Sequence, residues 1–505
     1  MSTPLHDSSG ELRRIFTLLS SAIETLVDDQ DKAKQEDFYN HTTHHFTGST
    51  SRTQYDAVKV IRAAMGSLES LIVDPHDLLL DFSMSYLRSR ALHIAAEKNI
   101  AAQLAKAGPE GLPSHKLARM SGIQDDKLRT SHAGISFEPH FAEVRDDHFV
   151  NNHVSQILAD DIEFNALIVT RYAMDVHPFM LRKMFISFRG QIQYAASDFL
   201  PSALSKSPSG DADKSCPNAF QLAARTKLTF FEWLHQRLPE HDVDWRFPTP
   251  QQYQRYSAVH EYKSLSDVTI PRPEKELFNV AMGGFGRAHD RCCIEDYPWH
   301  RLGDEATIVD VGGGIGTFCM RLHSRHPKLN VVVQDKAPVI EQATSVWKDR
   351  YPKAVSQGTA RLMTHDFFQR NPISGAEIYW LRHILHDWQD DEAVAILSSI
   401  RESMTASSLV LIVEILMITT LASDKVQAAP APLLANYGHA MNTAHAMDLN
   451  MMAMTDGKER SPTEYERIVR AAGLRIVKIW DCRGLLSIIE CQLDPFATSE
   501  VQGTN

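Results

Sequence analysis

The run Thr307-Ile308-Val309-Asp310-Val311-Gly312-Gly313-Gly314-Ile315-Gly316 indicates the architecture of the chain. Five residues that favour a strand lead directly into a cluster of glycines, and a segment with helical spacing of apolar residues follows. This order predicts a strand, a tight turn and a helix at the edge of a doubly wound sheet, where nucleotide-like ligands bind. Glycine lets the backbone approach such a ligand where a side chain would clash.

The spacing of the glycines distinguishes between ligands. A dinucleotide-binding fingerprint needs glycine at its first, third and sixth positions, and counting from Gly312 puts Thr317 at the sixth. The pattern acid-x-Gly-x-Gly-x-Gly instead resembles motif I of the class I S-adenosylmethionine-dependent methyltransferases. Asp335 ends the next predicted strand, about 20 residues after the glycines, where a carboxylate that binds ribose is expected. An ordinary glycine turn is the alternative, and Asp335 makes it the weaker one.

Strands and helices alternate regularly from residue 304 onward. We expect strands at 307–311, 330–335, 360–366, 376–381 and 408–416, helices at 338–347 and 390–404, and final strands at 474–480 and 485–493. Ser461 and Glu464 form a capping box that begins another helix, and Gly473 closes it. The pattern predicts an α/β fold, a class I methyltransferase doubly wound sheet with an antiparallel edge strand.

The N-terminal half has mainly helical patterns, including 11–28, 56–104, 114–122 and 220–238. With the wing-like segment 141–152, it resembles the winged-helix-like dimerisation domain of plant- and fungal-type O-methyltransferases, and this resemblance implies a homodimer. The segment Thr130–Pro139 departs from that module, because Gly134 and Pro139 interrupt an expected helix. We predict an N-terminal helix and polar loop (1–55), a dimerisation domain (56–270), a cofactor-binding catalytic domain (271–495) and a tail (496–505).

A second motif, Arg382-His383-Ile384-Leu385-His386-Asp387-Trp388, follows the fourth predicted strand and should lie beside the cofactor. Methyl transfer to a hydroxyl requires the attacking oxygen to lose its proton. Imidazole, with a pKa of about 6.5, is a competent general base for a phenol of pKa about 10. His386 is the candidate base.

The frame Arg-x-x-x-His-Asp-Trp resembles the catalytic stretch of caffeate- and flavonoid-type O-methyltransferases and their fungal relatives. The resemblance implies that Glu414 and Glu459 orient His386, and Glu414 would otherwise be a costly charge inside an apolar strand. It also implies cofactor contacts from Asp310, Gly312, Gly314, Asp335, Asp366, Phe367 and Arg382, although the family usually has Lys at the last position. The candidate acceptor-binding residues are Phe278, Met282, Asp387, Asn450 and Met454. Plain core positions are the alternative for Phe278 and the methionines.

A metal site is the weaker interpretation of the histidines. His383 and His386 are spaced i, i+3 and keep a divalent metal open as an alternative, but no carboxylate cluster demands one. His41, His44 and His45 lie in a polar segment without carboxylate or cysteine partners, so a loop is expected there.

Composition excludes several other classes of protein. The net charge of -11 disfavours nucleic-acid binding. The apolar run 409–422 is short and carries Glu414, so no membrane span is expected. The six cysteines show no zinc spacing, and the N-terminus shows no export signal, so we expect a reduced, cytoplasmic protein.

Together these patterns predict an S-adenosylmethionine-dependent O-methyltransferase that acts on a small, aromatic hydroxylated metabolite. One rival is a protein of the same fold that uses the cofactor for N-methylation or a cyclisation. Another is a catalytically silent regulatory partner, which the departure at Thr130–Pro139 favours.

Overall fold

The computed structural model describes residues 8–36, 51–124, 141–160, 192–205, 217–239, 269–421 and 425–496. Contacts along the chain divide it into two compact units. The first comprises Met1–Leu78, His289–Met451 and Gly457–Asn505, and the second comprises Leu79–Ala288 with Met452–Asp456. The domain boundaries predicted from the sequence were drawn from motifs and not from contacts, and they stay a prediction.

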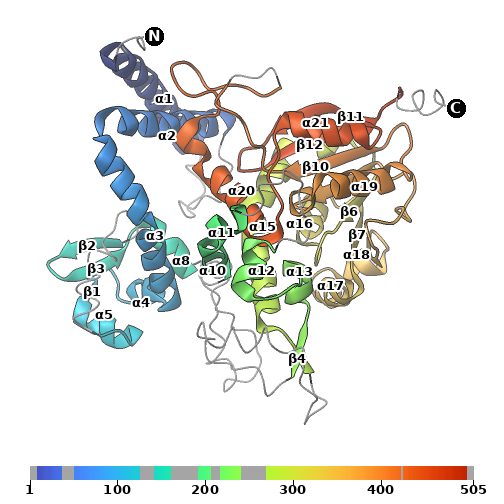
Figure 1. Cartoon of the computed structure of the whole chain (residues 1–505), viewed down its shortest axis with the longest axis horizontal. Helices are drawn as coiled ribbons and strands as arrows, with labels where there is room; N and C mark the ends of the chain where they lie inside the picture. The colour runs from blue at the N-terminus through green and yellow to red at the C-terminus, as the bar shows by residue number, and fades with distance from the viewer. Residues whose placement is uncertain are drawn as a thin grey trace. The chain divides into compact units, whose positions relative to one another are not determined.

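The first unit contains a seven-stranded sheet, in the part of the chain coloured yellow to red in Figure 1, with the order β11-β12-β10-β9-β6-β7-β8. Five strands are parallel: β6 (Thr307–Val311), β7 (Asn330–Asp335), β8 (Ala360–Thr364), β9 (Ile378–Arg382) and β10 (Leu409–Glu414). At the other edge β12 (Ser487–Leu493) is antiparallel to both β10 and β11 (Leu474–Asp481). The predicted α/β fold with an antiparallel edge is confirmed.

The order of the strands brings the two sequence motifs together. The chain runs from β6 outward to β7 and β8, and then returns to place β9 on the other side of β6. Between β6 and β9 the direction of winding reverses, and ligands of open α/β sheets bind at such a point. The glycine turn after β6 and the His386 turn after β9 therefore leave the same edge of adjacent strands.

Buried apolar side chains explain why this sheet forms. β6, β7, β9 and β10 are almost continuously buried, as expected for parallel strands covered on both faces. Phe318 stacks on Trp380 with ring centroids 4.1 Å apart.

The unit's helices and 3-10 turns include α16 (Thr317–Arg325), α17 (Ala337–Arg350), α18 (Pro352–Ser356), α19 (Asp390–Arg401), α21 (Pro462–Ala471), η5 (Trp299–Arg301), η6 (Leu385–Asp387) and η7 (Gly438–Met441).

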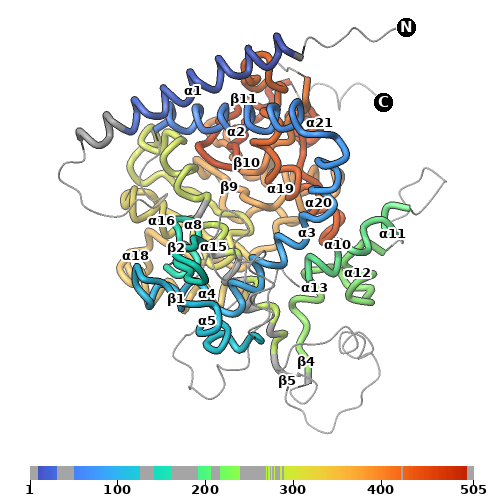
Figure 2. Tube along the Cα trace, turned by 90° about the vertical axis from the view of Figure 1, so that its left-hand side faces the viewer, coloured from blue at the N-terminus to red at the C-terminus, as the bar shows by residue number. Residues whose placement is uncertain are grey.

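Two N-terminal helices belong to the same unit. Figure 2 shows α1 (Ser8–Glu36) and α2 (Arg52–Ile72) side by side, and α2 also packs on η7. A side chain at Gly66 would come within 2.3 Å of His439 Cβ, so glycine permits the close approach of α2 and η7. The Tyr55 hydroxyl donates a hydrogen bond to the Gly484 carbonyl, at 2.8 Å.

The second unit has the helix and hairpin that the sequence indicates. Helix α5 (Ser114–Ser121) lies between strand β1 (Leu112–Pro113) and the hairpin of β2 (Phe141–Arg145) and β3 (His148–Asn151), and the three strands pair in the order β1-β3-β2. The departure at Thr130–Pro139 lies outside the described residues. The other elements are α4 (Ile100–Ala105), α8 (His153–Asp160), α10 (Tyr194–Asp198), α11 (Leu200–Leu204), α12 (Ala219–Ala224), α13 (Phe230–Leu234), and the paired strands β4 (Arg237–Pro239) and β5 (Thr269–Pro271).

One helix prediction in this unit is wrong. The sequence predicts a continuous helix over 220–238, whereas the structure has α12, then α13, then β4. Arg225 ends α12 in a left-handed conformation, and Thr229 and Glu232 form a capping box that begins α13. The Thr-x-x-Glu spacing of Thr229 and Glu232 is the sequence feature that indicates a new helix start here. Three helices cross the limits of the units: α3 (Pro75–Glu97), α15 (Pro273–Asp296) and α20 (Asn442–Thr455).

Candidate active site

The glycine turn is shaped by what lies around it. A side chain at Gly313 would come within 2.5 Å of the Asp310 carboxyl, and one at Gly312 within 2.6 Å of Ile384 Cδ1. Asp310 is buried beneath the turn, where the Cys319 thiol contacts its Oδ2 at 3.3 Å. Burial raises the pKa of the Asp310 carboxyl to about 6. Asp310 therefore lies where it supports the backbone of the turn.

Asp335 is tied directly to this turn. Its Oδ2 accepts a hydrogen bond from the Gly314 amide at 2.9 Å, and its Oδ1 accepts one from the Lys336 amide at 2.7 Å. Each carboxylate oxygen has a second lone pair and can still accept a hydroxyl hydrogen bond. A side chain at Gly314 would meet no atom within 4 Å, so the backbone there borders open space.

Asp366 and Phe367 follow the neighbouring strand β8. Asp366 is exposed, and the half-buried ring of Phe367 lies edge-on to Trp388 with centroids 5.8 Å apart. A carboxylate next to a glycine turn, with an aromatic ring on the adjacent strand end, fits a ligand composed of a ribose and a flat base. These residues are thus suited to hold S-adenosylmethionine.

Arg382 has a buried acidic partner that its sequence motif does not indicate. Its guanidinium pairs with the fully buried carboxylate of Asp290 in α15, which also pairs with Arg321. The Asp310 carboxyl also interacts with Arg382, and the Arg382 guanidinium is a donor group suited to an anionic ligand group such as the methionyl carboxylate. Nothing in the local pattern of α15 distinguishes Asp290 from a surface acid.

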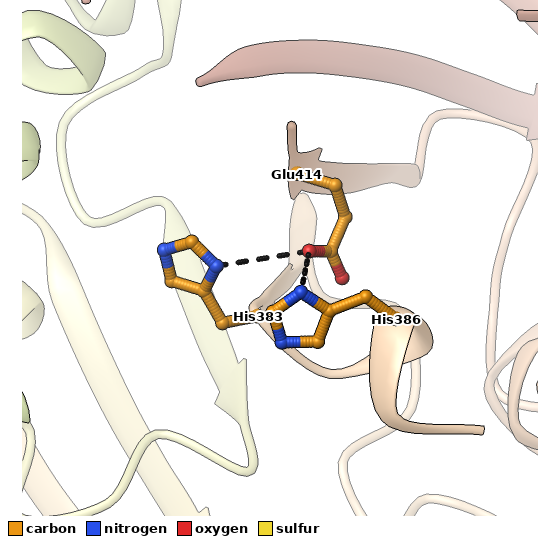
Figure 3. A group of neighbouring side chains, drawn as sticks. All are labelled: His383, His386 and Glu414. Carbon is orange, nitrogen blue, oxygen red and sulfur yellow. Dashed lines mark ion pairs between the residues drawn. The ribbon is translucent and has the colours of Figure 1, made fainter. Parts of the chain in front are cut away.

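His386 lies in η6, at the carboxyl edge of β9, and is buried. Its Nδ1 is 2.9 Å from Glu459 Oε1 and 3.4 Å from Glu414 Oε2, whereas its Nε2 is 3.9 Å from Asp387 Oδ2 (Figure 3 shows the contact with Glu414). Glu414 Oε1 accepts hydrogen bonds from the Ile384 and Leu385 amides. The two carboxylates flank Nδ1, so Nε2 is the nitrogen suited to a substrate proton.

The carboxylates around His386 favour its protonated form, so only a ring that has lost this proton can accept one from a substrate. Burial by itself lowers the pKa of His386, but the carboxylates of Glu414 and Glu459 outweigh it and hold that pKa well above its ordinary value. Burial raises the pKa of the Glu414 carboxyl. His383, which is largely buried beside His386, has a pKa well below its ordinary value, because burial disfavours its charged form.

The residues that hold the His386 turn in place are not marked by any local sequence pattern. The Lys458 amide donates to the His386 carbonyl at 3.0 Å. The fully buried Arg460 donates to the Leu385 carbonyl at 2.5 Å and to the Trp388 carbonyl at 2.6 Å. The segment 458–460 therefore fixes both the backbone and, through Glu459, the ring of His386.

The candidate acceptor residues are divided between the units. Asp387 and Asn450 belong to the first unit, whereas Phe278, Met282 and Met454 belong to the second. Phe278 packs edge-on against Phe230 with centroids 5.6 Å apart, and Met454 is buried in the same apolar cluster. Both are placed as the core interpretation expects, and contact with an acceptor stays a prediction.

Residues 273–475 match the family model described as the O-methyltransferase domain. The chain is 35% identical to the O-methyltransferase tpcA of Aspergillus fumigatus, over 88% of each chain. It is 36% identical to the O-methyltransferase gedA of Aspergillus terreus, over 87% of each. The chain belongs to the plant- and fungal-type S-adenosylmethionine-dependent O-methyltransferase family.

The fold also occurs with another chemistry. A solved structure titled "A Pericyclic Reaction enzyme" matches with a TM-score of 0.58 and 19% identity, covering 93% of this chain and 100% of that one. At this identity the likeness shows the fold alone. Membership of the family nevertheless identifies this chain as an O-methyltransferase whose cofactor is S-adenosyl-L-methionine. Within the described residues no helix has the length and apolar content needed to span a bilayer.

Proposed function

We propose that this enzyme methylates a hydroxyl group of a small aromatic metabolite and that His386 is the general base. The observation that carries the proposal is the buried pairing of His386 Nδ1 with Glu459 Oε1 at 2.9 Å, on the turn that leaves β9. In the neutral ring, this pairing favours the tautomer with hydrogen on Nδ1 and a lone pair on Nε2.

In the proposed mechanism, Nε2 of His386 accepts the proton of the acceptor hydroxyl as the oxygen attacks. Bound S-adenosylmethionine supplies an electrophilic methyl group on its sulfonium. Glu414 and Glu459 stabilise the imidazolium that forms, because their carboxylates lie 3.4 Å and 2.9 Å from its Nδ1. An aromatic hydroxyl suits this base better than an aliphatic one, because a phenol of pKa about 10 gives up its proton far more readily.

For the cofactor we propose that Asp335 binds the ribose hydroxyls, that Asp366 and Phe367 flank the adenine, and that the Arg382 guanidinium lies near the methionyl carboxylate. The open backbone at Gly314 and the double pairing of Asp290 support these assignments. Gly312 would lie at the amino-acid portion.

The enzyme is further proposed to be a homodimer through its N-terminal helices. Helix α3 exposes a run of large apolar side chains, among them Leu79, Leu80 and Phe82, each more than 60% accessible. A helix with such a surface needs an apolar partner, and a second copy of the chain supplies one. We also propose a cytoplasmic location, which the free thiols among the described cysteines favour.

The second candidate is a protein of the same fold that uses the cofactor for a reaction other than O-methylation, because the fold also occurs in a protein titled "A Pericyclic Reaction enzyme". It predicts cofactor binding without methyl transfer to a hydroxyl. The His386–Glu459 pair argues against it, since a buried carboxylate and imidazole are costly to keep without a use.

Titration calorimetry with S-adenosylhomocysteine tests the cofactor site first. We expect micromolar binding by the wild type and its loss in Asp335→Ala. Phenolic acceptors are then screened with His386→Ala, which we expect to bind S-adenosylhomocysteine normally while turnover falls by about 100-fold or more. Normal turnover by His386→Ala would reject His386 as the base, and absence of any binding by folded wild type would reject the cofactor site.

A further inference from the structure

His383 is a largely buried histidine to which the methyl-transfer mechanism gives no part. It follows β9 with a φ of 55°, a conformation that is uncommon for residues other than glycine. Its side chain is 18% exposed, and its Nδ1 lies 3.7 Å from Glu414 Oε2. His383 thus lies against the same carboxylate that flanks the proposed base.

Two histidine side chains converge on a single oxygen atom of Glu414. Figure 3 shows a ring nitrogen of His383 and one of His386 directed at Glu414 Oε2, and the second separation is 3.4 Å. The two rings are stacked, with centroids 5.3 Å apart. Glu414 Oε2 is buried and accepts no hydrogen bond from any residue that the structure describes. One potential ligand atom from each side chain lies within 4.8 Å of the other two.

The two separations between a histidine nitrogen and Glu414 Oε2 are close to those between neighbouring ligands of a tetrahedral metal ion. Zinc binds imidazole nitrogen and carboxylate oxygen at about 2.0–2.2 Å, so two ligands at a tetrahedral angle lie about 3.4 Å apart. The observed 3.4 Å and 3.7 Å require little movement of the side chains. Two histidines with one glutamate is also a donor set that zinc accepts while keeping a fourth position open.

The charge of the cluster favours a dication. Glu414 and Glu459 both have fully buried side chains, and in the described parts of the chain their ion pairs involve histidines alone. Carboxylate groups buried away from water are costly unless a cation offsets their charge. A divalent ion with two neutral imidazoles would leave no net charge.

We propose that His383, His386 and Glu414 form a binding site for a divalent transition cation such as Zn²⁺, and that the bound ion inhibits methyl transfer. A cation on His386 Nδ1 replaces the hydrogen bond to Glu459. Its charge then opposes the second positive charge that the ring acquires when Nε2 accepts a proton. The inhibition rests on the proposed role of His386, whereas the binding does not.

Cobalt spectroscopy tests the binding without relying on activity. Untagged enzyme, stripped with a chelator, is titrated with Co²⁺, whose visible d–d bands report a four-coordinate site. We expect one equivalent to bind to the wild type, and Zn²⁺ to displace it. In His383→Asn, where asparagine tolerates the positive φ, affinity should fall by at least about 10- to 100-fold. His300→Asn, which removes an exposed histidine of η5, is the matched control and should bind as the wild type does.

Inhibition is measured with the same proteins. We expect Zn²⁺ to suppress wild-type turnover, a chelator to restore it, and His383→Asn to retain S-adenosylhomocysteine binding and turnover while it resists Zn²⁺. Equal Co²⁺ binding by wild type and His383→Asn, or no four-coordinate spectrum in the wild type, overturns the site. A site that binds the ion without inhibition overturns the inhibitory role and counts against His386 as the base.

Discussion

Arg460 connects the proposed base to the segment that carries Glu459. Its guanidinium reaches two backbone carbonyls, one on each side of His386, and its Nε donates to Asp390 Oδ1 at 2.9 Å. A guanidinium presents several donors in a rigid fork, so one side chain can hold two points of a turn at once. Arg460 is therefore a positioning residue for His386.

Replacing Arg460 with lysine should separate catalysis from cofactor binding. Lysine keeps the charge beside Asp390 but cannot reproduce the forked contacts, so the His386 turn shifts. We expect kcat to fall by about 100-fold, with S-adenosylhomocysteine affinity close to that of the wild type. Arg467→Lys is the matched control, because Arg467 pairs with Asp390 from an exposed position. Equal effects of the two variants on kcat would contradict the positioning role.

Asp310 is a buried carboxyl whose protonation is linked to folding. Its pKa is raised by burial from 3.8 to about 6, so between these values the folded state holds a proton that the unfolded state has released. Stability contributed by this group is thus complete below pH 3.8 and is lost as the pH rises toward about 6. The loss is on the order of 3 kcal/mol.

Asp310→Asn should remove this dependence. Asparagine has nearly the same shape and no charge to desolvate, so the variant should gain free energy of unfolding relative to the wild type as the pH rises from 4 to 7. Urea midpoints followed by tryptophan fluorescence at the two pH values provide the measurement. A difference between variant and wild type that does not change with pH would show that Asp310 titrates normally.

At the scale of elements, the turn after β6 and the turn after β9 are in direct contact. Gly312 has a φ of +72°, and a side chain there would meet Ile384, two residues before His386. The Ile384 amide also donates a hydrogen bond to Glu414, so Ile384 has little room to move away from Gly312. A displacement of either turn therefore displaces the other. The contact between Gly312 and Ile384 therefore affects both the proposed cofactor-binding turn and the position of His386.

Gly312→Ala and Gly358→Ala form a matched pair. Both glycines have a positive φ, but a side chain at Gly358 would meet nothing within 4 Å. Each variant should lose about 1–2 kcal/mol of stability from backbone strain. We expect Gly312→Ala in addition to weaken S-adenosylhomocysteine binding by about tenfold or more and to lower kcat, because Ile384 must move. If calorimetry gave similar S-adenosylhomocysteine affinities for the two variants, the contact between Gly312 and Ile384 would have no effect on cofactor binding.

At the scale of the whole molecule, the apolar surface of α3 makes the oligomeric state testable. We expect light scattering to give twice the 56.8 kDa of one chain. Leu80→Glu introduces a charge on a side chain that is 62% exposed, so it should dissociate the dimer without unfolding the monomer. Leu421→Glu, at another exposed leucine, is the control and should leave the mass unchanged. A monomeric wild type would reject the homodimer.

Local patterns were sufficient for much of this protein. Residue spacing was enough to predict the glycine turn, the alternation of strands and helices, and the Ser461 capping box, because backbone conformation and burial repeat with a short period along the chain. The same motifs were enough to indicate the family. The candidate base and its carboxylates were also predicted from sequence. His386 and Glu459 are 73 residues apart, and it was the family resemblance that joined them.

Tertiary structure decided the contacts that no local pattern marks. Asp290 and Arg460 carry charges that a sequence pattern assigns to the surface, yet both are buried because partners from distant segments satisfy them. The capping box at Thr229 broke a helix that apolar spacing alone predicted to continue. His383 acquires its place beside Glu414 because β9 and β10 are paired in parallel, which brings two side chains 31 residues apart to one edge of the sheet.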